Sequence, residues 1–171
     1  FDNEYRYIFE PFHPRRVSFS KDFGDRKYIH PDKSDKNLYN KFLFILSGQI
    51  RNPWSDNYNK KFISKKRLIK EIRLNLCLNW IKNNFSEIPI VLLIRHPFPT
   101  AISQDKFNLH TDLNDYLDQE DLMKDYLSNF KLEIEKAKEK SEFEQNVFIW
   151  CIENYLPLKQ FKKDEICFTF Y

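Results

Sequence analysis

The stretch PIVLLIRHPFPTAIS, residues 89–103, decides the fold that we expect for this chain. It begins with an apolar run rich in β-branched residues, which is typical of a parallel strand covered on both faces. Arg95 ends the run, and Pro97 and Pro99 favour a turn and the first positions of a helix. Ser103 follows Arg95 by eight residues, so we expect it in the early turns of that helix.

The segment before this strand completes a βαβ unit. RLIKEIR, residues 67–73, alternates apolar and charged positions and predicts a strand, while residues 74–85 carry apolar side chains at helical spacing. A strand, a helix and a second strand in this order predict a parallel pair with a right-handed crossover. In a regular strand Lys70 and Glu71 point to opposite faces, and Arg73 lies near the strand's end.

The N-terminal part predicts one strand and one helix between loops. YRYIF, residues 5–9, is a short aromatic strand that ends at Glu10-Pro11, and residues 36–47 form a helix that stops at Gly48. Polar stretches without a steady period predict long loops over residues 13–35 and 50–62.

The C-terminal part predicts two helices and a strand. Apolar positions from Met123 to Ala137 mark one face of a long helix. Ser141 and Glu144 have the spacing of a capping box, which starts a second helix that we expect Pro157 to limit. EICFTFY, residues 165–171, closes the chain as a buried strand.

Composition narrows the classes of protein. The 171 residues predict a single domain, and a net charge of +3 from 28 basic and 25 acidic residues argues against a nucleic-acid partner but leaves room for a small anionic ligand. No apolar run is long enough to predict a membrane span in this segment. Cys77, Cys151 and Cys167 lie in apolar runs, so we expect buried thiols in a reducing compartment.

Only two glycines occur in the sequence, so it contains no Gly-rich phosphate loop. Both ends of the chain have a strand-like composition, and we therefore expect the 171 residues to be part of a longer domain.

Arg95 and Ser103 have two interpretations. Ligands of parallel α/β sheets bind at the carboxyl ends of the strands, where a guanidinium and a hydroxyl can hold a phosphate. In the alternative, Arg95 pairs with a carboxylate to cap the strand, and Ser103 is a hydroxyl on the helix surface.

Three blocks resemble sulfotransferases that use 3′-phosphoadenosine 5′-phosphosulfate (PAPS). Residues 67–103 resemble the central segment of that family, in which an Arg followed eight positions later by a Ser binds the 3′-phosphate of the donor. YIFEPFHP, residues 7–14, resembles the Glu-Pro turn of the carbohydrate sulfotransferase branch, and residues 147–171 resemble the later helix and strand. The resemblance implies a three-layer α/β fold, with a parallel sheet of the P-loop nucleoside triphosphate hydrolase type flanked by helices.

The resemblance also implies a reaction and a set of site residues. PAPS would be the cofactor and a carbohydrate hydroxyl the acceptor, with no metal required, and the loop for the 5′-phosphosulfate would precede Phe1. Arg95, Ser103 and Arg73 would contact the cofactor. Glu10 would be the general base and Lys70 would stabilise the charge on the bridging oxygen, whereas the ordinary alternatives are a solvated turn carboxylate and a lysine that extends from the sheet.

Other residues remain outside this catalytic set. His13 and His96 flank the two motifs, but a histidine beside a turn is more often a surface hydrogen-bonder. Trp54 and Tyr58 lie in a loop with amide and charged side chains, which suits saccharide recognition, although solvated loops anchored by aromatic rings would have the same composition.

Two other functions fit the same sequence. One is another P-loop-type nucleotide-dependent transferase, such as a kinase, and the other is a non-catalytic module that binds polyanions. The abundance of Lys, Asn, Ile and Phe is typical of an AT-rich bacterial genome. Together with the cysteines, it favours the cytoplasm over the Golgi lumen.

Overall fold

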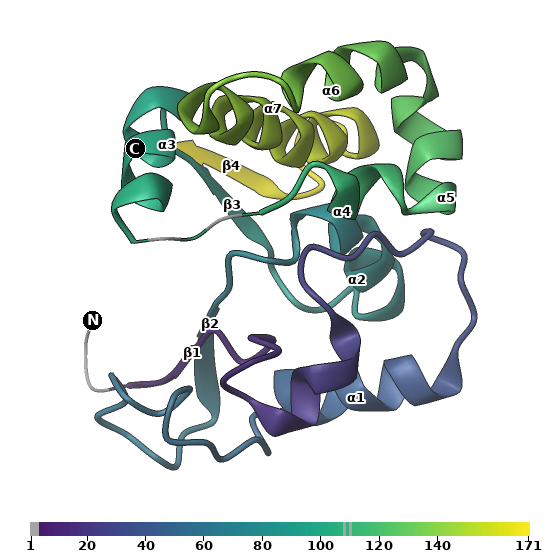
Figure 1. Cartoon of the computed structure of the whole chain (residues 1–171). Helices are drawn as coiled ribbons and strands as arrows, with labels where there is room; N and C mark the ends of the chain where they lie inside the picture. The colour runs from purple at the N-terminus through teal and green to yellow at the C-terminus, as the bar shows by residue number, and fades with distance from the viewer. Residues whose placement is uncertain (1–3, 108, 110) are drawn as a thin grey trace. The chain divides into compact units, whose positions relative to one another are not determined.

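The computed structural model describes residues 4–107, 109 and 111–171, and it has a mixed α/β architecture (Figure 1). The chain forms two compact units. The first contains the residues up to Lys27 together with Ser34–Leu74, and the second contains Tyr28–Lys33 together with Asn75–Tyr171.

A two-stranded parallel sheet and two helical segments form the first unit. β1 (Tyr5–Phe9) pairs with β2 (Lys66–Lys70) in a register that places Phe9 beside Lys70. The other elements are a 3₁₀ helix, η1 (Ser18–Phe23), and α1 (Lys36–Leu46). The predicted strand at residues 5–9 and the helix that begins at Lys36 are confirmed, whereas β2 ends three residues earlier than predicted.

Aromatic side chains fill the core of the first unit. The ring of Phe12 lies 4.5 Å from that of Phe42 and 5.4 Å from that of Phe23, measured between centroids. All three side chains are buried, and they join the turn after β1 to η1 and α1.

Buried Arg6 attaches β1 to the loop that follows α1. Its guanidinium donates to the Gly48 and Ile50 carbonyls and pairs with Asp56 at 2.9 Å. Gly48 has a φ of 75°, and a Cβ there would lie 2.5 Å from the Arg67 side chain. The glycine that ends α1 therefore allows both the left-handed backbone and the close approach of two arginines.

The second unit consists of a two-stranded parallel sheet and a helical layer. α3 and α6 pack against α7 (Figure 1). Its core contains Tyr28, Leu76, Leu113, Tyr116, Leu122, Leu127, Ile134, Ile149, Ile152 and Leu156. Its elements are η2 (Asn75–Cys77), α2 (Leu78–Asn84), β3 (Val91–Ile94), α3 (Pro97–Lys106), α4 (Asn114–Leu117), α5 (Glu120–Leu122), the π-helical η3 (Met123–Leu127), η4 (Ser128–Phe130), α6 (Lys131–Ala137), α7 (Glu142–Gln160) and β4 (Cys167–Phe170).

The strand pairing differs from the predicted βαβ unit. β2 pairs with β1 and β3 pairs with β4, both in parallel, and no ladder joins β2 to β3 among the described residues. The strands therefore follow one another along the chain as predicted, but each strand pairs with a partner that is distant in sequence. Sequence periodicity specifies strands and does not specify their partners.

The prediction that the apolar strand is covered on both faces is wrong for the described residues. Leu92 and Ile94 are buried, while Val91 and Leu93 are 62% and 60% exposed. Nor is β4 a buried strand, since Cys167 and Phe170 are both exposed. The apolar run therefore places side chains on both faces of β3, but only the face with Leu92 and Ile94 is packed in the described residues.

α7 begins as predicted and ends later. Ser141 and Glu144 form the capping box, with the Glu144 backbone N–H donating to Ser141 Oγ and the Ser141 N–H donating to Glu144 Oε2. The helix continues past Pro157 to Gln160, which corrects the predicted end. Pro157 offers no N–H to the Glu153 carbonyl, and Asn75 Nδ2 donates to that carbonyl at 3.4 Å instead.

The long helix predicted from Met123 to Ala137 is interrupted. A π-helical turn occupies Met123–Leu127 and a 3₁₀ turn follows before α6. Leu122 and Leu127 are both buried and lie five positions apart, a spacing that does not place two side chains on the same face of an α-helix. The wider π turn brings both side chains to the core.

Burial also differs among the cysteines. All three are free thiols, but only Cys77 is buried, while Cys151 and Cys167 are exposed. The prediction of burial was wrong for Cys151 and Cys167. Their neighbours in sequence are apolar, but these two residues lie on the solvent-facing sides of α7 and β4.

Candidate functional site

Charged side chains gather at the carboxyl ends of β1 and β2, with Glu10 at the centre. Glu10 Oε2 accepts a hydrogen bond from Arg73 Nη1 at 2.9 Å, and Glu10 Oε1 accepts a short one from Lys70 Nζ. Arg73 Nε is also paired with Asp25 Oδ1 at 2.9 Å. Three of the five predicted site residues, at positions 10, 70 and 73, are therefore in direct contact.

The backbone of Glu10 fixes the position of its carboxylate. The Glu10 N–H donates to the Lys70 carbonyl at 2.8 Å, and the Glu10 carbonyl accepts from the His13 N–H at 3.2 Å. Between these two bonds Glu10 has a φ of 40°, which is unusual for a residue with a side chain. Such a conformation costs on the order of 1–3 kcal/mol and persists where the surroundings enforce it.

Glu71 does not point away from this cluster as a regular strand would require. β2 ends at Lys70, so the alternation of side chains stops there. The Glu71 carboxylate accepts from the Phe12 and Ile72 backbone N–H groups, both at 2.9 Å, and lies 3.5 Å from Arg73 Nη1. Arg73 is therefore surrounded by three carboxylates, two of them buried.

The ion pairs set the protonation of Glu10. Burial alone would raise the pKa of Glu10, but the hydrogen bonds from Lys70 and Arg73 outweigh burial and lower that pKa below its ordinary value. The same contacts make the carboxylate a weaker proton acceptor. In contrast, burial raises the pKa of Glu71, even though backbone N–H groups bind that carboxylate.

Lys70 is the member of the cluster that solvent reaches best. Its side chain is 40% exposed, against 7% for both Glu10 and Arg73. Its ammonium also lies 4.7 Å from the centroid of the Phe9 ring, within the range of a cation–π contact. The ammonium is thus held by Glu10 and the Phe9 ring, while part of the Lys70 side chain reaches solvent.

His13 lies next to this cluster, although sequence analysis set it aside. Burial, and then the charge of Arg73, lower the pKa of His13. Its Nδ1 accepts from the Arg15 N–H at 3.3 Å, which leaves Nε2 without a hydrogen bond in the described part of the chain. A neutral imidazole in this position is chemically able to accept a proton.

Arg95 lies just after β3 and is exposed. Its guanidinium carbon is 5.6 Å from the Tyr171 ring centroid, and its carbonyl accepts from Trp150 Nε1 at 2.9 Å. Across the described ranges, no carboxylate forms an ion pair with Arg95. The alternative in which Arg95 caps the strand by pairing with a carboxylate is therefore not what the structure contains.

Ser103 lies in α3, the helix in which the sequence predicted it, and it is half-buried. The helix starts at Pro97, and His96 Nδ1 caps it by accepting from the Phe98 N–H at 3.3 Å. His96 thus acts as a structural hydrogen-bonder. Ser103 is six residues into the helix, about 9 Å along the axis at the usual rise per residue.

The five predicted residues divide into two groups. Glu10, Lys70 and Arg73 belong to the first unit, and Arg95 and Ser103 belong to the second. The first group forms one connected cluster. The second group shares one strand–helix connection of the βα type.

Sequence analysis missed two members of the first cluster. Asp25 follows Gly24 in a long loop, and nothing in its local pattern pointed to Arg73. Glu71 was placed on the wrong face because the strand was expected to continue to Arg73.

The aromatic residues of the loop at 50–62 lie beside the same strand end. The Trp54 ring is 5.4 Å from both the Phe9 and the His13 rings, and the Tyr58 ring is 5.0 Å from that of Phe9. Tyr58 is 60% exposed. An exposed aromatic surface therefore borders the charged cluster.

The sequence matches no protein-family model, and comparisons with curated proteins and with solved structures give no significant match. Within the described part of the chain, no three His, Cys, Asp or Glu side chains are grouped so that they could hold a metal ion. None of the described helices is both long enough and apolar enough to cross a bilayer.

Proposed function

We propose that the protein is a sulfotransferase that moves a sulfuryl group from PAPS to a hydroxyl of a carbohydrate acceptor. The observation that carries the proposal is Arg95, an exposed arginine without an ion-pair partner in the described residues, placed where a parallel strand enters the helix that bears Ser103. A guanidinium in this position suits a phosphate, and a hydroxyl adds a second donor.

The charged cluster supplies the chemistry that the transfer needs. The acceptor oxygen attacks sulfur, the bond from sulfur to the bridging phosphate oxygen breaks, and the acceptor proton passes to a base. Lys70, whose side chain partly reaches solvent, would stabilise the negative charge that develops on the bridging oxygen, and Arg73 would hold Glu10 in position. The products are a sulfate ester and adenosine 3′,5′-bisphosphate.

Two residues compete for the role of base. Glu10 is ionised and fixed at the strand end, but its lowered pKa weakens it as a proton acceptor. His13 starts from a higher ordinary pKa, 6.5 against 4.5 for Glu10, and the lowering of its pKa keeps the imidazole unprotonated near neutral pH, so it is the alternative base. We retain Glu10 as the predicted base and treat His13 as the residue against which it must be tested.

The finer fold is part of the proposal. A three-layer sulfotransferase-type fold requires a parallel sheet, and the parallel pairing of β1 with β2 and of β3 with β4 supports this part of the proposal. It also requires a phosphate-binding loop, which the two glycines of this sequence do not provide. A cytoplasmic location is also part of the proposal, and the free thiols, which suit a reducing compartment, support it.

Calorimetry with adenosine 3′,5′-bisphosphate and the full-length protein tests the proposal. Arg95→Ala should lower the affinity by about 10- to 100-fold, the usual loss for a charged hydrogen bond to phosphate. Lys106→Ala, which removes an exposed cation at the far end of α3, is the matched control and should not change the affinity. An unchanged affinity in Arg95→Ala would contradict the proposal.

The same measurement separates the other functions. A kinase would be stabilised by ATP only with magnesium, whereas the sulfotransferase should be stabilised by adenosine 3′,5′-bisphosphate without it. A polyanion-binding module would bind neither nucleotide specifically, and its affinity for polyanions would fall steeply with salt.

A further inference from the structure

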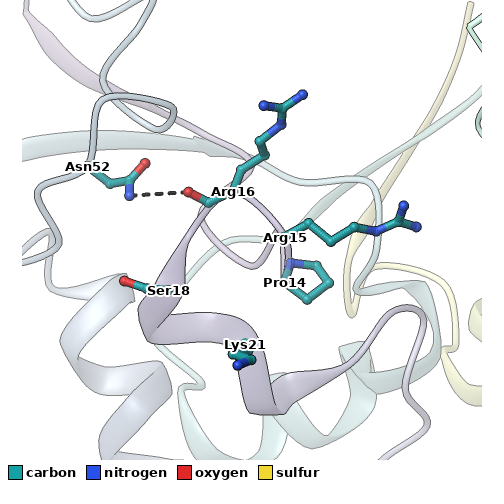
Figure 2. Close-up of a pocket in the computed structure, with 6 residues that line it drawn as sticks. All are labelled: Pro14, Arg15, Arg16, Ser18, Lys21 and Asn52. Atoms are coloured by element: carbon teal, nitrogen blue, oxygen red, sulfur yellow. Dashed lines mark hydrogen bonds between the residues drawn. The ribbon is translucent and has the colours of Figure 1, made fainter.

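An open hollow lies on the first unit, next to the turn that follows Glu10. Its volume is about 600 Å³, and it is lined by Pro14, Arg15, Arg16, Ser18, Lys21 and Asn52 (Figure 2). Arg15 and Arg16 extend from one turn, while Lys21 comes from η1. The hollow is separate from the contacts between Glu10, Lys70 and Arg73.

The charges in this hollow have one sign. Three cationic side chains line it, and no carboxylate does. Arg15, Arg16 and Lys21 form no ion pair with any residue that the structure describes, whereas neighbouring Asp22 lies 3.4 Å from Lys41. Like charges held together raise the electrostatic potential of a concave surface and favour an anion there.

The backbone holds the two arginines in a fixed turn. The Arg16 and Val17 N–H groups both donate to the His13 carbonyl, at 3.3 and 3.0 Å. Asn52 Nδ2 donates to the Arg16 carbonyl at 3.4 Å, which attaches the turn to the loop at 50–62 (Figure 2). The backbone that carries the two arginines is therefore held in place, while their exposed side chains point in different directions in Figure 2 and would turn toward a bound anion.

An aromatic ring adjoins the cations. The Arg16 guanidinium carbon lies 5.3 Å from the centroid of the Trp54 ring, which is half-buried. Trp54 is not one of the residues that line the hollow but adjoins it through Arg16, whereas the hydroxyl of Ser18 and the amide of Asn52 line the hollow itself. An indole, a hydroxyl and an amide beside cations form a surface that suits a sugar with a negative substituent better than a bare anion.

We propose that this hollow binds a saccharide that already carries an anionic group, such as a sulfate, a phosphate or a carboxylate. Arg15, Arg16 and Lys21 would hold the anionic group, and the surface near Trp54 would contact the sugar ring. Only the assignment of this saccharide as the acceptor rests on the proposed sulfuryl transfer. Binding itself does not, because the hollow contains none of the predicted cofactor residues.

Calorimetry with N-acetylglucosamine 6-sulfate, N-acetylglucosamine and sodium sulfate, in the absence of nucleotide, tests this proposal. We expect the sulfated sugar to bind more tightly than either of the other two probes. The double variant Arg15→Gln/Arg16→Gln should weaken binding of the sulfated sugar about tenfold or more, because charge-assisted bonds are lost. Lys60→Gln/Lys61→Gln is the matched control, since it removes the same charge from exposed residues of the same unit outside the hollow.

Several results would overturn the proposal. They are a sulfated sugar that does not bind, equal binding of the sugar with and without sulfate, sodium sulfate binding as tightly as the sulfated sugar, or an equal loss in the control variant. If the double variant unfolds, the single variant Lys21→Gln, at an exposed position, provides a second measurement of the affinity for the sulfated sugar. Failure of adenosine 3′,5′-bisphosphate to bind would leave this proposal standing while removing the sulfotransferase.

Discussion

Two arginines follow parallel strands in this protein, and their surroundings are opposite. Arg73 follows β2, is 7% exposed and contacts Glu10, Asp25 and Glu71. Arg95 follows β3, is exposed, and has the Tyr171 ring near its guanidinium and no ion pair within the described residues. The carboxyl end of one strand pair has its charges neutralised within the protein, while the other presents a charge to solvent.

The difference separates what holds the site together from what is available to a ligand. A buried arginine surrounded by carboxylates has its hydrogen-bonding capacity in use and stabilises the fold around it. An exposed arginine contributes little to folding and retains its capacity for a phosphate. This reasoning favours Arg95 over Arg73 as the residue that binds the cofactor.

The strongest test of the comparison is Arg73→Leu. Removing the guanidinium leaves Glu10 and Glu71 buried without their shared cation, which should lower the free energy of unfolding by about 3–5 kcal/mol. Urea unfolding measures this change. Lys66→Met, which breaks the exposed pair with Glu4, is the control and should cost about 1 kcal/mol or less. If both variants lose the same small amount, the buried cluster does not stabilise the first unit.

Acid unfolding of Glu10→Gln gives the next largest effect. Because the pKa of Glu10 is lowered in the folded protein, its contribution is present above the ordinary value of 4.5 and is lost as the pH falls below that value. The wild-type protein should therefore lose more of its free energy of unfolding than Glu10→Gln when the pH is lowered through this range. Equal losses in the two proteins would show that the carboxylate is not stabilised by Lys70 and Arg73.

The sequence predicted the elements of this structure better than their partners. The strand at residues 5–9, the helix from Lys36 and the capping box at Ser141 depend on local patterns, and all three are confirmed. The pairing of β3 with β4 joins residues far apart in the chain, and no local pattern encodes that choice. Strand partners depend on packing, which periodicity does not describe.

The candidate site shows the same limit. The placement of Glu10 after a strand and of Ser103 on a helix followed from proline positions and apolar runs. The contact of Arg73 with Asp25 did not, because it joins a loop to a strand end across the first unit. Burial of an ion pair depends on that tertiary contact, so the pairing of Glu10 with two cations could not be predicted from local patterns.

Arg95→Ala has the smallest expected effect on stability of the variants compared with Arg73→Leu. The side chain is exposed and has no ion pair in the described residues, so the free energy of unfolding should change by less than about 0.5 kcal/mol. Urea unfolding under the conditions used for Arg73→Leu makes the two arginines directly comparable. A loss as large as that of Arg73→Leu would mean that Arg95 supports the fold of the second unit. Any loss of nucleotide binding in Arg95→Ala would then reflect unfolding and not a missing contact with phosphate.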